Sequence, residues 1–259
     1  MKTTTIRIVA HFSPLWYNLS MEKATKQSSL KPKLQKAKAK VAATIHGQPA
    51  KDLKIIAITG DTGNDLVAHF IHEILTVNKV PTALITSPGS ALSTLTLYRY
   101  LSKCLRSGAT HVVVEVPAIA LGRQVFHNLP VHMAVLTNTA TGADADDAIA
   151  HKAMLFQNSP QFTVLNRDDP KYDHFATFAP QTASATYGKH KDSGTRINRS
   201  KLYKKGTEAN LVHNSANFDV ATFATGEEIV PLMAAAAAAA GLLGISEDTI
   251  IDGIASYEP

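Results

Sequence analysis

The sequence predicts an α/β fold, a mostly parallel sheet flanked by helices, with a small antiparallel β meander near residues 199–224. Two observations favour it. Apolar runs of strand length alternate with helical segments between residues 51 and 169, which is typical of parallel βαβ units. After residue 183 the helical period is lost, and short strand-like runs are joined by turn residues.

The elements follow in order. The first strand is expected at 54–59, where the isoleucines are typical of a strand buried on both faces. A helix follows at 65–78, with Leu66, Phe70 and Ile74 at helical spacing. Further strands are expected at 82–86, 111–116, 133–137 and 162–165. Helices are expected between them at 92–107 and 144–156.

The remaining elements belong to the third zone of the chain. Meander strands are expected at 199–204, 209–212 and 218–223. An alanine-rich helix is expected at 227–243, where the small side chains permit close packing. A last helix at 246–256 is expected to be capped by Ser246.

Length and composition fit one large domain. With 259 residues, 45% of them hydrophobic, the chain can bury a full core. We expect residues 51–259 to form this domain and residues 1–50 to form a basic helical or linker segment. Its lysines, seven between residues 23 and 40, fit a solvated helix or linker, or a face for nucleic acid, anionic lipid or an acidic partner. No aromatic residues interleave with them, so nucleic acid is not the expected partner.

Several classes of protein are not expected. The single cysteine, Cys104, excludes an internal disulfide framework and suits a reducing cytoplasm. No apolar run is long enough to span a bilayer, and residues 6–12 are too short and polar for a signal peptide. We therefore expect a cytoplasmic protein.

The most informative motif is the glycine turn after the first expected strand. Thr59, Gly60, Asp61, Thr62 and Gly63 occupy the frame of a phosphate-binding loop. The lysine of such a loop reaches the β- and γ-phosphates, and the following hydroxyl binds Mg²⁺. Here these two positions are Asn64 and Asp65. In parallel sheets, ligands bind at the carboxyl ends of the strands, where 60–65, 115–117, 138–141 and 166–169 would meet.

Six segments, taken in order, resemble the central, ATP-binding domain of the Mur ligases, above all the MurE-like branch. They are the strand and glycine loop at 57–65, the strand with Glu-Val at 108–116, the strand ending in Thr-Asn at 131–138, Lys-Ala-Met-Leu-Phe at 152–156, the strand ending in Asn-Arg-Asp-Asp at 164–169, and the alanine-rich helix with Leu-Gly-Ile at 234–245. The resemblance covers residues 51–259. It implies that the family's N-terminal uridine-nucleotide domain and C-terminal domain are absent.

The resemblance implies an activity and its residues. Mur ligases transfer the γ-phosphate of ATP to a carboxylate, and an amine then attacks the acyl phosphate, helped by Mg²⁺. The implied nucleotide-binding residues are Thr59, Gly60, Asp61, Thr62, Gly63, Asn64, Asp65 and Asn138. Glu115 and Asp65 would bind the metal, and Arg123 would bind substrate. Lys152 occupies the position of the family's carbamylated lysine. The alternatives are a capping or salt-bridged carboxylate for Glu115 and an ordinary surface lysine for Lys152.

The departures from the family pattern are concentrated in the chemistry. Asn64 brings no positive charge, and Asp65 adds a negative one where the triphosphate would lie. The usual Ser-Ser-His is replaced at 117–119, the usual Arg-Asp-His is missing from 139–147, and two usual asparagines are Glu228 and Pro231. Each lost charge-stabilising group costs about 2–4 kcal/mol of transition-state energy.

Two hypotheses follow. In the first, the chain is a pseudo-ligase related to peptidoglycan stem-peptide synthesis that binds a partner, such as an active Mur ligase or another cell-wall protein. In the second, it is a functional ATP-dependent ligase or ATP-binding protein, using ATP and Mg²⁺ and completed by another chain. Lys51, Lys54 or Arg123 would then replace the loop lysine.

Overall fold

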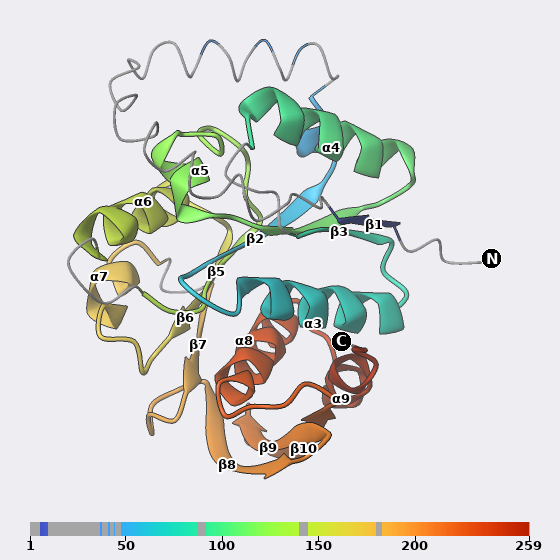
Figure 1. Ribbon diagram of the computed structural model, residues 1–259, viewed down its shortest axis with the longest axis vertical. Coiled ribbons are helices and arrows are strands. Elements are labelled where there is room, and N and C mark those ends of the chain that lie inside the picture. The colour runs from blue at the N-terminus through green and yellow to red at the C-terminus, as the bar shows by residue number, and fades with distance from the viewer. Residues whose placement is uncertain are drawn as a thin grey trace.

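The computed structural model describes residues 6–9, 37, 41, 44, 48–86, 92–139, 145–179 and 183–258 (Figure 1). Most of the basic segment expected at 1–50 lies outside these residues, including all of its lysines between 23 and 40. Residues 140–144 of the segment that lacks the family's Arg-Asp-His also lie outside them.

A ten-stranded sheet organises the described chain, in the order β1-β3-β4-β2-β5-β6-β7-β8-β9-β10. The strands are β1 (Ile6–Val9), β2 (Lys54–Thr59), β3 (Thr82–Thr86), β4 (His111–Glu115), β5 (Met133–Leu136), β6 (Phe162–Asn166), β7 (Ser184–Gly188), β8 (Thr195–Tyr203), β9 (Gly206–His213) and β10 (Ala216–Thr222). Pairing is parallel from β1 to β8, and β8, β9 and β10 pair antiparallel. This architecture confirms the predicted fold class.

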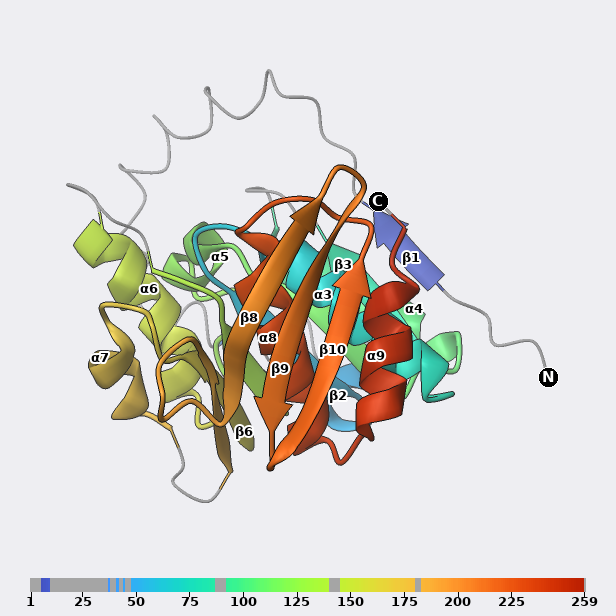
Figure 2. The same cartoon turned by 90° about the horizontal axis from the view of Figure 1, so that it is seen from below.

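Helices cover both faces of the sheet (Figure 1). They are η1 (Pro49–Lys51), α3 (Asn64–Val77), α4 (Thr94–Arg106), α5 (Ala118–Gly122), α6 (Ala145–Gln157), α7 (Tyr172–Ala176), α8 (Ile229–Leu242) and α9 (Glu247–Ala255). One hydrophobic core lies on the side of α3, α8 and α9, and a second lies on the side of α4, α5, α6 and α7. Strands β8 to β10 curl around the first core, so that α8 is enclosed between them and α3 (Figure 2).

The alanine-rich helix α8 is buried along most of its length. All seven alanines from Ala234 to Ala240 are at most 1% exposed. Helix α8 contacts α3 on one side and β7, β8 and β9 on the others. Methyl side chains allow this close approach, because a larger side chain would push a neighbouring element away. The predicted close packing of this helix is confirmed.

Several boundaries differ from the expectation. Strand β8 begins at Thr195 rather than 199, β9 spans Gly206–His213 rather than 209–212, and β10 ends at Thr222 rather than 223. The parallel strand β7 was not expected, because Ser184, Ala185 and Thr186 carry no apolar run. The short helices α5 and α7 and the edge strand β1 were not expected either.

The last helix follows the expectation closely. Helix α9 begins after Ser246, whose side-chain oxygen accepts a hydrogen bond from the backbone N–H of Thr249. This is the predicted serine cap. Within the described residues, no helix is both long enough and apolar enough to cross a membrane.

Candidate nucleotide-loop site

The glycine loop lies at the point where the strand order reverses. The chain leaves β2 for β3 and β4 on one side and then crosses to β5 on the other, so the carboxyl end of β2 opens between β4 and β5. Ligands of parallel sheets bind at such a switch point. The hydroxyl of Thr59, the last residue of β2, donates to the carbonyl of Val116 at 2.9 Å, which ties the ends of β2 and β4 together.

Asn64 closes the loop from within. Its side chain is 7% exposed, its Nδ2 donates to the carbonyl of Gly60 at 3.1 Å, and its Oδ1 accepts from the hydroxyl of Thr137 at 2.8 Å. Gly60 is required here, since a Cβ atom at this position would lie 1.8 Å from the Thr137 hydroxyl oxygen. The residue at the position of the loop lysine therefore points into the protein and holds the loop together.

The carboxamide of Asn138 fills the first half of the loop. Its Oδ1 accepts from the backbone N–H groups of Asp61 at 2.8 Å and Thr62 at 3.0 Å. Its Nδ2 donates to the carbonyl and the hydroxyl of Thr62 at 3.0 and 3.1 Å. An amide oxygen thus occupies two N–H groups that the sequence predicted to face phosphate.

The second half of the loop is the start of α3. Gly63 precedes the helix with a φ of +75°, a conformation that favours glycine, and no side chain caps the helix. The first N–H groups of α3 have no intrahelical partner. Asp65 is exposed in this first turn, and its carboxylate has the sign that a helix N-terminus favours. This end of the loop is therefore already supplied with a negative charge.

Lys152 is buried next to the loop. The side chain is 1% exposed, so the alternative of an ordinary surface lysine is wrong. Its Nζ lies 4.0 Å from Oδ1 of Asp61, which is half exposed, and it has no hydrogen-bond partner in the structure. Burial lowers the pKa of Lys152 from 10.5, and the nearby carboxylates of Asp61 and Asp169 oppose this change.

Two acidic residues after β6 complete the edge, although the sequence analysis assigned them no role. Asp169 is buried and accepts hydrogen bonds from the backbone N–H and hydroxyl of Thr139 at 2.7 and 2.8 Å. Asp168 accepts from the backbone N–H groups of Lys189 and His190. Their place directly after a parallel strand is the signal by which residues 166–169 were predicted to lie at this edge.

Tyr187 of β7 also stabilises this edge of the sheet, through the hydrogen bonds of its hydroxyl. Its side chain is fully buried, and its hydroxyl lies within hydrogen-bond distance of the carbonyls of Leu136 and Thr137, at 3.0 and 2.9 Å. Burial raises the pKa of Tyr187 well above 10, and the carboxylates of Asp169 and Asp168 add to this effect. Asn166 also donates to the carbonyl of Thr137 at 2.9 Å. The segment that carries Asn138 is thereby fixed from two strands.

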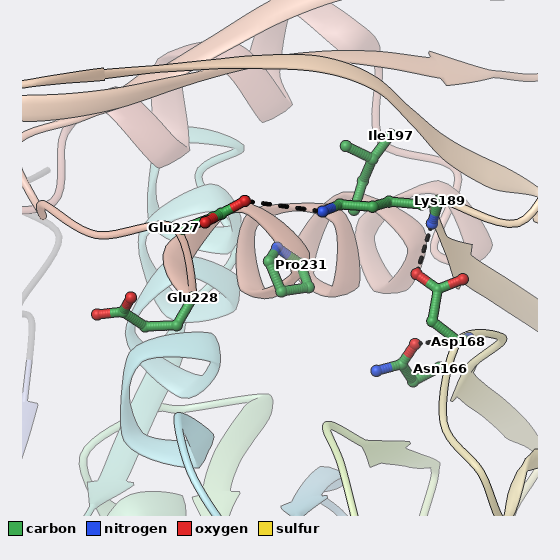
Figure 3. Close-up of a pocket in the computed structure, with 7 residues that line it drawn as sticks. All are labelled: Asn166, Asp168, Lys189, Ile197, Glu227, Glu228 and Pro231. Carbon is green, nitrogen blue, oxygen red and sulfur yellow. Dashed lines mark hydrogen bonds and ion pairs between the residues drawn. The ribbon is translucent and has the colours of Figure 1, made fainter.

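Two adjoining pockets lie beside the loop. The smaller, of about 160 Å³, is lined by loop residues and by Asn138, Asn166, Glu228 and Pro231, among others. The larger, of about 550 Å³, is shown in Figure 3 and is lined by Asn166, Asp168, Lys189, Ile197, Glu227, Glu228 and Pro231. The two positions that are asparagine in the family pattern, Glu228 and Pro231, line both pockets.

The larger pocket carries more negative than positive charge. Its lining contains three carboxylates, of Asp168, Glu227 and Glu228, and one ammonium, of Lys189. The Nζ of Lys189 lies 3.9 Å from a carboxylate oxygen of Glu227 across the pocket, whereas Glu228 points away from Lys189 (Figure 3). The lining therefore leaves a net negative charge next to the loop.

The other predicted residues are placed as follows. Glu115 is the last residue of β4 and is partly buried at the same edge. Arg123 follows α5, which packs on α6, the helix of Lys152. Lys54 is the first residue of β2, about 16 Å from the loop at the rise of a strand, so it cannot replace the loop lysine. Lys51 lies in η1, before this strand.

The described residues contain no cluster of the kind that holds a metal ion by protein ligands alone. No group of three or more histidine, cysteine, aspartate or glutamate side chains is placed to hold a metal ion in this part of the chain. The two predicted ligands come from different elements, Asp65 from the first turn of α3 and Glu115 from the end of β4.

The fold and the loop together define a class, that of α/β proteins with a glycine loop between the central parallel strand and a helix. A family model described as the Mur ligase middle domain matches residues 58–240. The chain belongs to the Mur ligase family, which confirms the resemblance stated above.

Two curated relatives and one solved structure illustrate the similarity. The chain is 29% identical to UDP-N-acetylmuramyl-tripeptide synthetase 2 of Oceanobacillus iheyensis, over 81% of this chain and 47% of that protein. It is 30% identical to UDP-N-acetylmuramoyl-L-alanyl-D-glutamate--2,6-diaminopimelate ligase of Solibacter usitatus, over 86% and 49%. A solved ligase of the latter name superposes with a TM-score of 0.71 at 24% identity, over 78% of this chain and 46% of that one. The chain spans about half the length of these proteins.

Proposed function

We propose that this chain is a divergent Mur ligase middle-domain module that has lost ATP-dependent ligation and acts by binding a partner. The two relatives are named as a UDP-N-acetylmuramyl-tripeptide synthetase and a UDP-N-acetylmuramoyl-L-alanyl-D-glutamate--2,6-diaminopimelate ligase. The proposed partner is an active ligase of that pathway or another cell-wall protein, in the cytoplasm. The site residues named from the sequence are then remnants of a nucleotide site.

The observation that carries this proposal is the filled loop. Asn138 occupies the N–H groups of Asp61 and Thr62, and Asn64 bonds to Gly60 and Thr137 instead of reaching outward. A phosphate that used the first half of the loop would have to displace the carboxamide of Asn138. The four hydrogen bonds of that carboxamide, at about 0.5–1.5 kcal/mol each, would be lost from the protein on binding.

Electrostatics supports the same proposal. ATP brings three or four negative charges, and the site offers it Asp65 in the first turn of α3 and Glu228 beside the loop. The ammonium of Lys152, which lies beside the loop, is buried and already faces Asp61. Because the position of the loop lysine holds a neutral carboxamide that bonds inward, the loop lacks the positive charge that would offset the triphosphate.

A second candidate function is ATP-dependent ligation completed by another chain. One observation favours it, the buried Nζ of Lys152, which has no hydrogen-bond partner in the structure. Burial lowers the pKa of this amine, which favours its neutral form, and a neutral amine can add CO₂ and lose a proton to become a carbamate. This is the position where the family carries that group. The carbamate would turn this ammonium into a carboxylate-like group beside Asp61.

Calorimetric titration with Mg-ATP tests the proposal. The natural chain should bind with a dissociation constant above about 1 mM, whereas the variant Asn64→Lys/Asp65→Thr should bind at least tenfold more tightly. A variant with the same change in charge at exposed positions far from the loop, Asn217→Lys/Asp252→Thr, serves as control and should match the natural chain. Binding by the natural chain in the low micromolar range would overturn the proposal and support the second candidate.

A further inference from the structure

The turn between β8 and β9 carries exposed apolar side chains. Leu202 is 54% exposed and Tyr203 is 50% exposed at the end of β8, and Phe223, directly after β10, is 62% exposed. Figure 2 shows this turn extending beyond the end of β10. We call these three residues, with Lys204 and Lys205 of the turn, the hairpin tip.

The strand register places the apolar side chains on both faces of the hairpin tip. Tyr203 pairs with Gly206, and a Cβ on Gly206 would lie 3.7 Å from the Cα of Phe223. Tyr203 and Phe223 therefore flank Gly206 in one row, roughly 10 Å apart at the usual strand spacing. Leu202 is one residue away and pairs with Thr207, so its side chain points to the opposite face.

Positive charge surrounds these apolar groups. Lys201, Lys204 and Lys205 are exposed at the end of β8 and in the turn, and Arg199 lies two residues further back. Two carboxylates oppose them. Asp219 lies 3.8 Å from Arg199, and Glu208 accepts a hydrogen bond from the hydroxyl of Tyr203. These six groups together leave a net charge of +2 at the hairpin tip and on the strands next to it.

We propose that the hairpin tip is a docking site for an anionic membrane surface. If the hairpin tip inserts into a lipid surface, lipid surrounds it and covers the apolar side chains on both faces. A folded protein partner would cover the side chains on one face. Tyrosine is favoured at the boundary between lipid and water, and lysines next to it are attracted to anionic headgroups. The proposal is independent of the glycine loop and of whether ligation is lost.

The position of the hairpin tip determines which edge of the sheet would face the membrane. Strand β8 is parallel to β7, so its carboxyl end lies at the same edge of the sheet as the glycine loop. The hydroxyl of Thr207, next to the turn, donates to the carbonyl of Gly226, which precedes Glu227 and Glu228 of the pockets. A membrane bound at the hairpin tip would therefore face the edge that carries the candidate site.

Sedimentation with lipid vesicles tests this inference on the full chain. The chain should bind vesicles with about one-third phosphatidylglycerol in phosphatidylcholine, and bind vesicles of phosphatidylcholine alone far more weakly. The variant Lys204→Gln/Lys205→Gln should lower the affinity for the anionic vesicles by about 25-fold. The variant Tyr203→Ser/Phe223→Ser should weaken binding at constant charge.

Two matched controls separate the hairpin tip from the rest of the surface. Lys51→Gln/Lys103→Gln removes the same two charges from exposed positions on η1 and α4 and should change the affinity less than threefold. Leu95→Ser removes an apolar side chain that is 53% exposed on α4 and should have no effect. Equal losses in tip and control variants, or no binding to anionic vesicles, would overturn the proposal. Binding to poly-glutamate without binding to vesicles would assign the hairpin tip to an acidic protein instead.

Discussion

Asn138 and Thr62 share three hydrogen bonds, although they are 76 residues apart in the chain. The carboxamide of Asn138 accepts from the N–H of Thr62 and donates to its carbonyl and hydroxyl. Every polar backbone group of Thr62 is thereby bonded to one side chain. The loop of this protein is thus held in shape by its own residues.

The first prediction concerns Asn138. Asn138→Ala should lower the free energy of unfolding by about 1–3 kcal/mol, because four hydrogen bonds are lost and two N–H groups of the loop lose their acceptor. Urea denaturation measures this change. Asn217→Ala, at an exposed position of β10, is the control and should stay within about 0.5 kcal/mol. Equal stability of the two variants would show that the bonds of Asn138 do not hold the loop.

A second prediction concerns Lys152. Replacing this buried ammonium by an apolar side chain of similar length, in Lys152→Met, should leave stability at neutral pH unchanged or raise it by about 1–2 kcal/mol. Burial lowers the pKa of Lys152, so the charged amine is disfavoured in the folded protein. The free-energy cost of burying this charge should decrease as pH rises toward 10.5, because the amine then loses its proton. The difference between the two proteins should shrink over that range.

The control for Lys152 is an exposed lysine. Lys103→Met on α4 should change stability by less than about 0.5 kcal/mol at any pH in the range. A loss of more than about 1 kcal/mol in Lys152→Met at neutral pH would mean that the pair with Asp61 outweighs the burial of the charge.

His111 makes the fold sensitive to acid. Burial, with the charges of Lys54 and His132 nearby, lowers the pKa of His111 from 6.5 to about 4. Between these two pH values His111 is protonated in the unfolded chain but neutral in the folded protein. The free energy of unfolding should therefore fall as pH drops from about 6.5 to about 4. His111→Gln should flatten this part of the curve of melting temperature against pH. Parallel curves for the two proteins would contradict the prediction.

Cys104 should be inert in the folded protein. Cys104 belongs to α4, and its side chain is fully buried in the core on that side of the sheet. Burial raises the pKa of the thiol to about 11. At pH 8 only about one thiol in a thousand is then ionised, and a thiol reagent cannot reach it. Labelling should follow the rate of unfolding and become fast in urea. Rapid labelling of the native protein would show that this core opens readily.

Much of the fold followed from local patterns. The strands from β2 to β6 are apolar runs between helical segments, and each lies near the expected residues. Strand β7 was not predicted because its buried residues, Tyr187 and Gly188, lie at one end of the strand. The small residues before them form no apolar run. The turns of the meander were recognised, but the strands run further toward them than their apolar residues suggested.

The candidate site was predictable only in part. The sequence placed Asn64 and Asp65 in the loop, since these positions are fixed by the neighbouring glycines. It did not predict that Asn64 turns inward to Thr137, because that contact joins the start of α3 to the segment after β5, 73 residues further along the chain. The burial of Lys152 was equally hidden, because a lysine in a helix reads as solvated until its neighbours are known. The direction of Asn64 and the burial of Lys152 both depend on residues that are distant in the sequence and close only in the folded protein.

The backbone amide signals of the loop test the central claim most directly. In an amide NMR spectrum of the natural chain, Mg-ATP added to about 1 mM should leave the signals of Asp61, Thr62 and Gly63 in place, because Asn138 already occupies the first two N–H groups. Saturable shifts of these three signals at micromolar Mg-ATP would contradict the claim and show that this loop still binds a nucleotide.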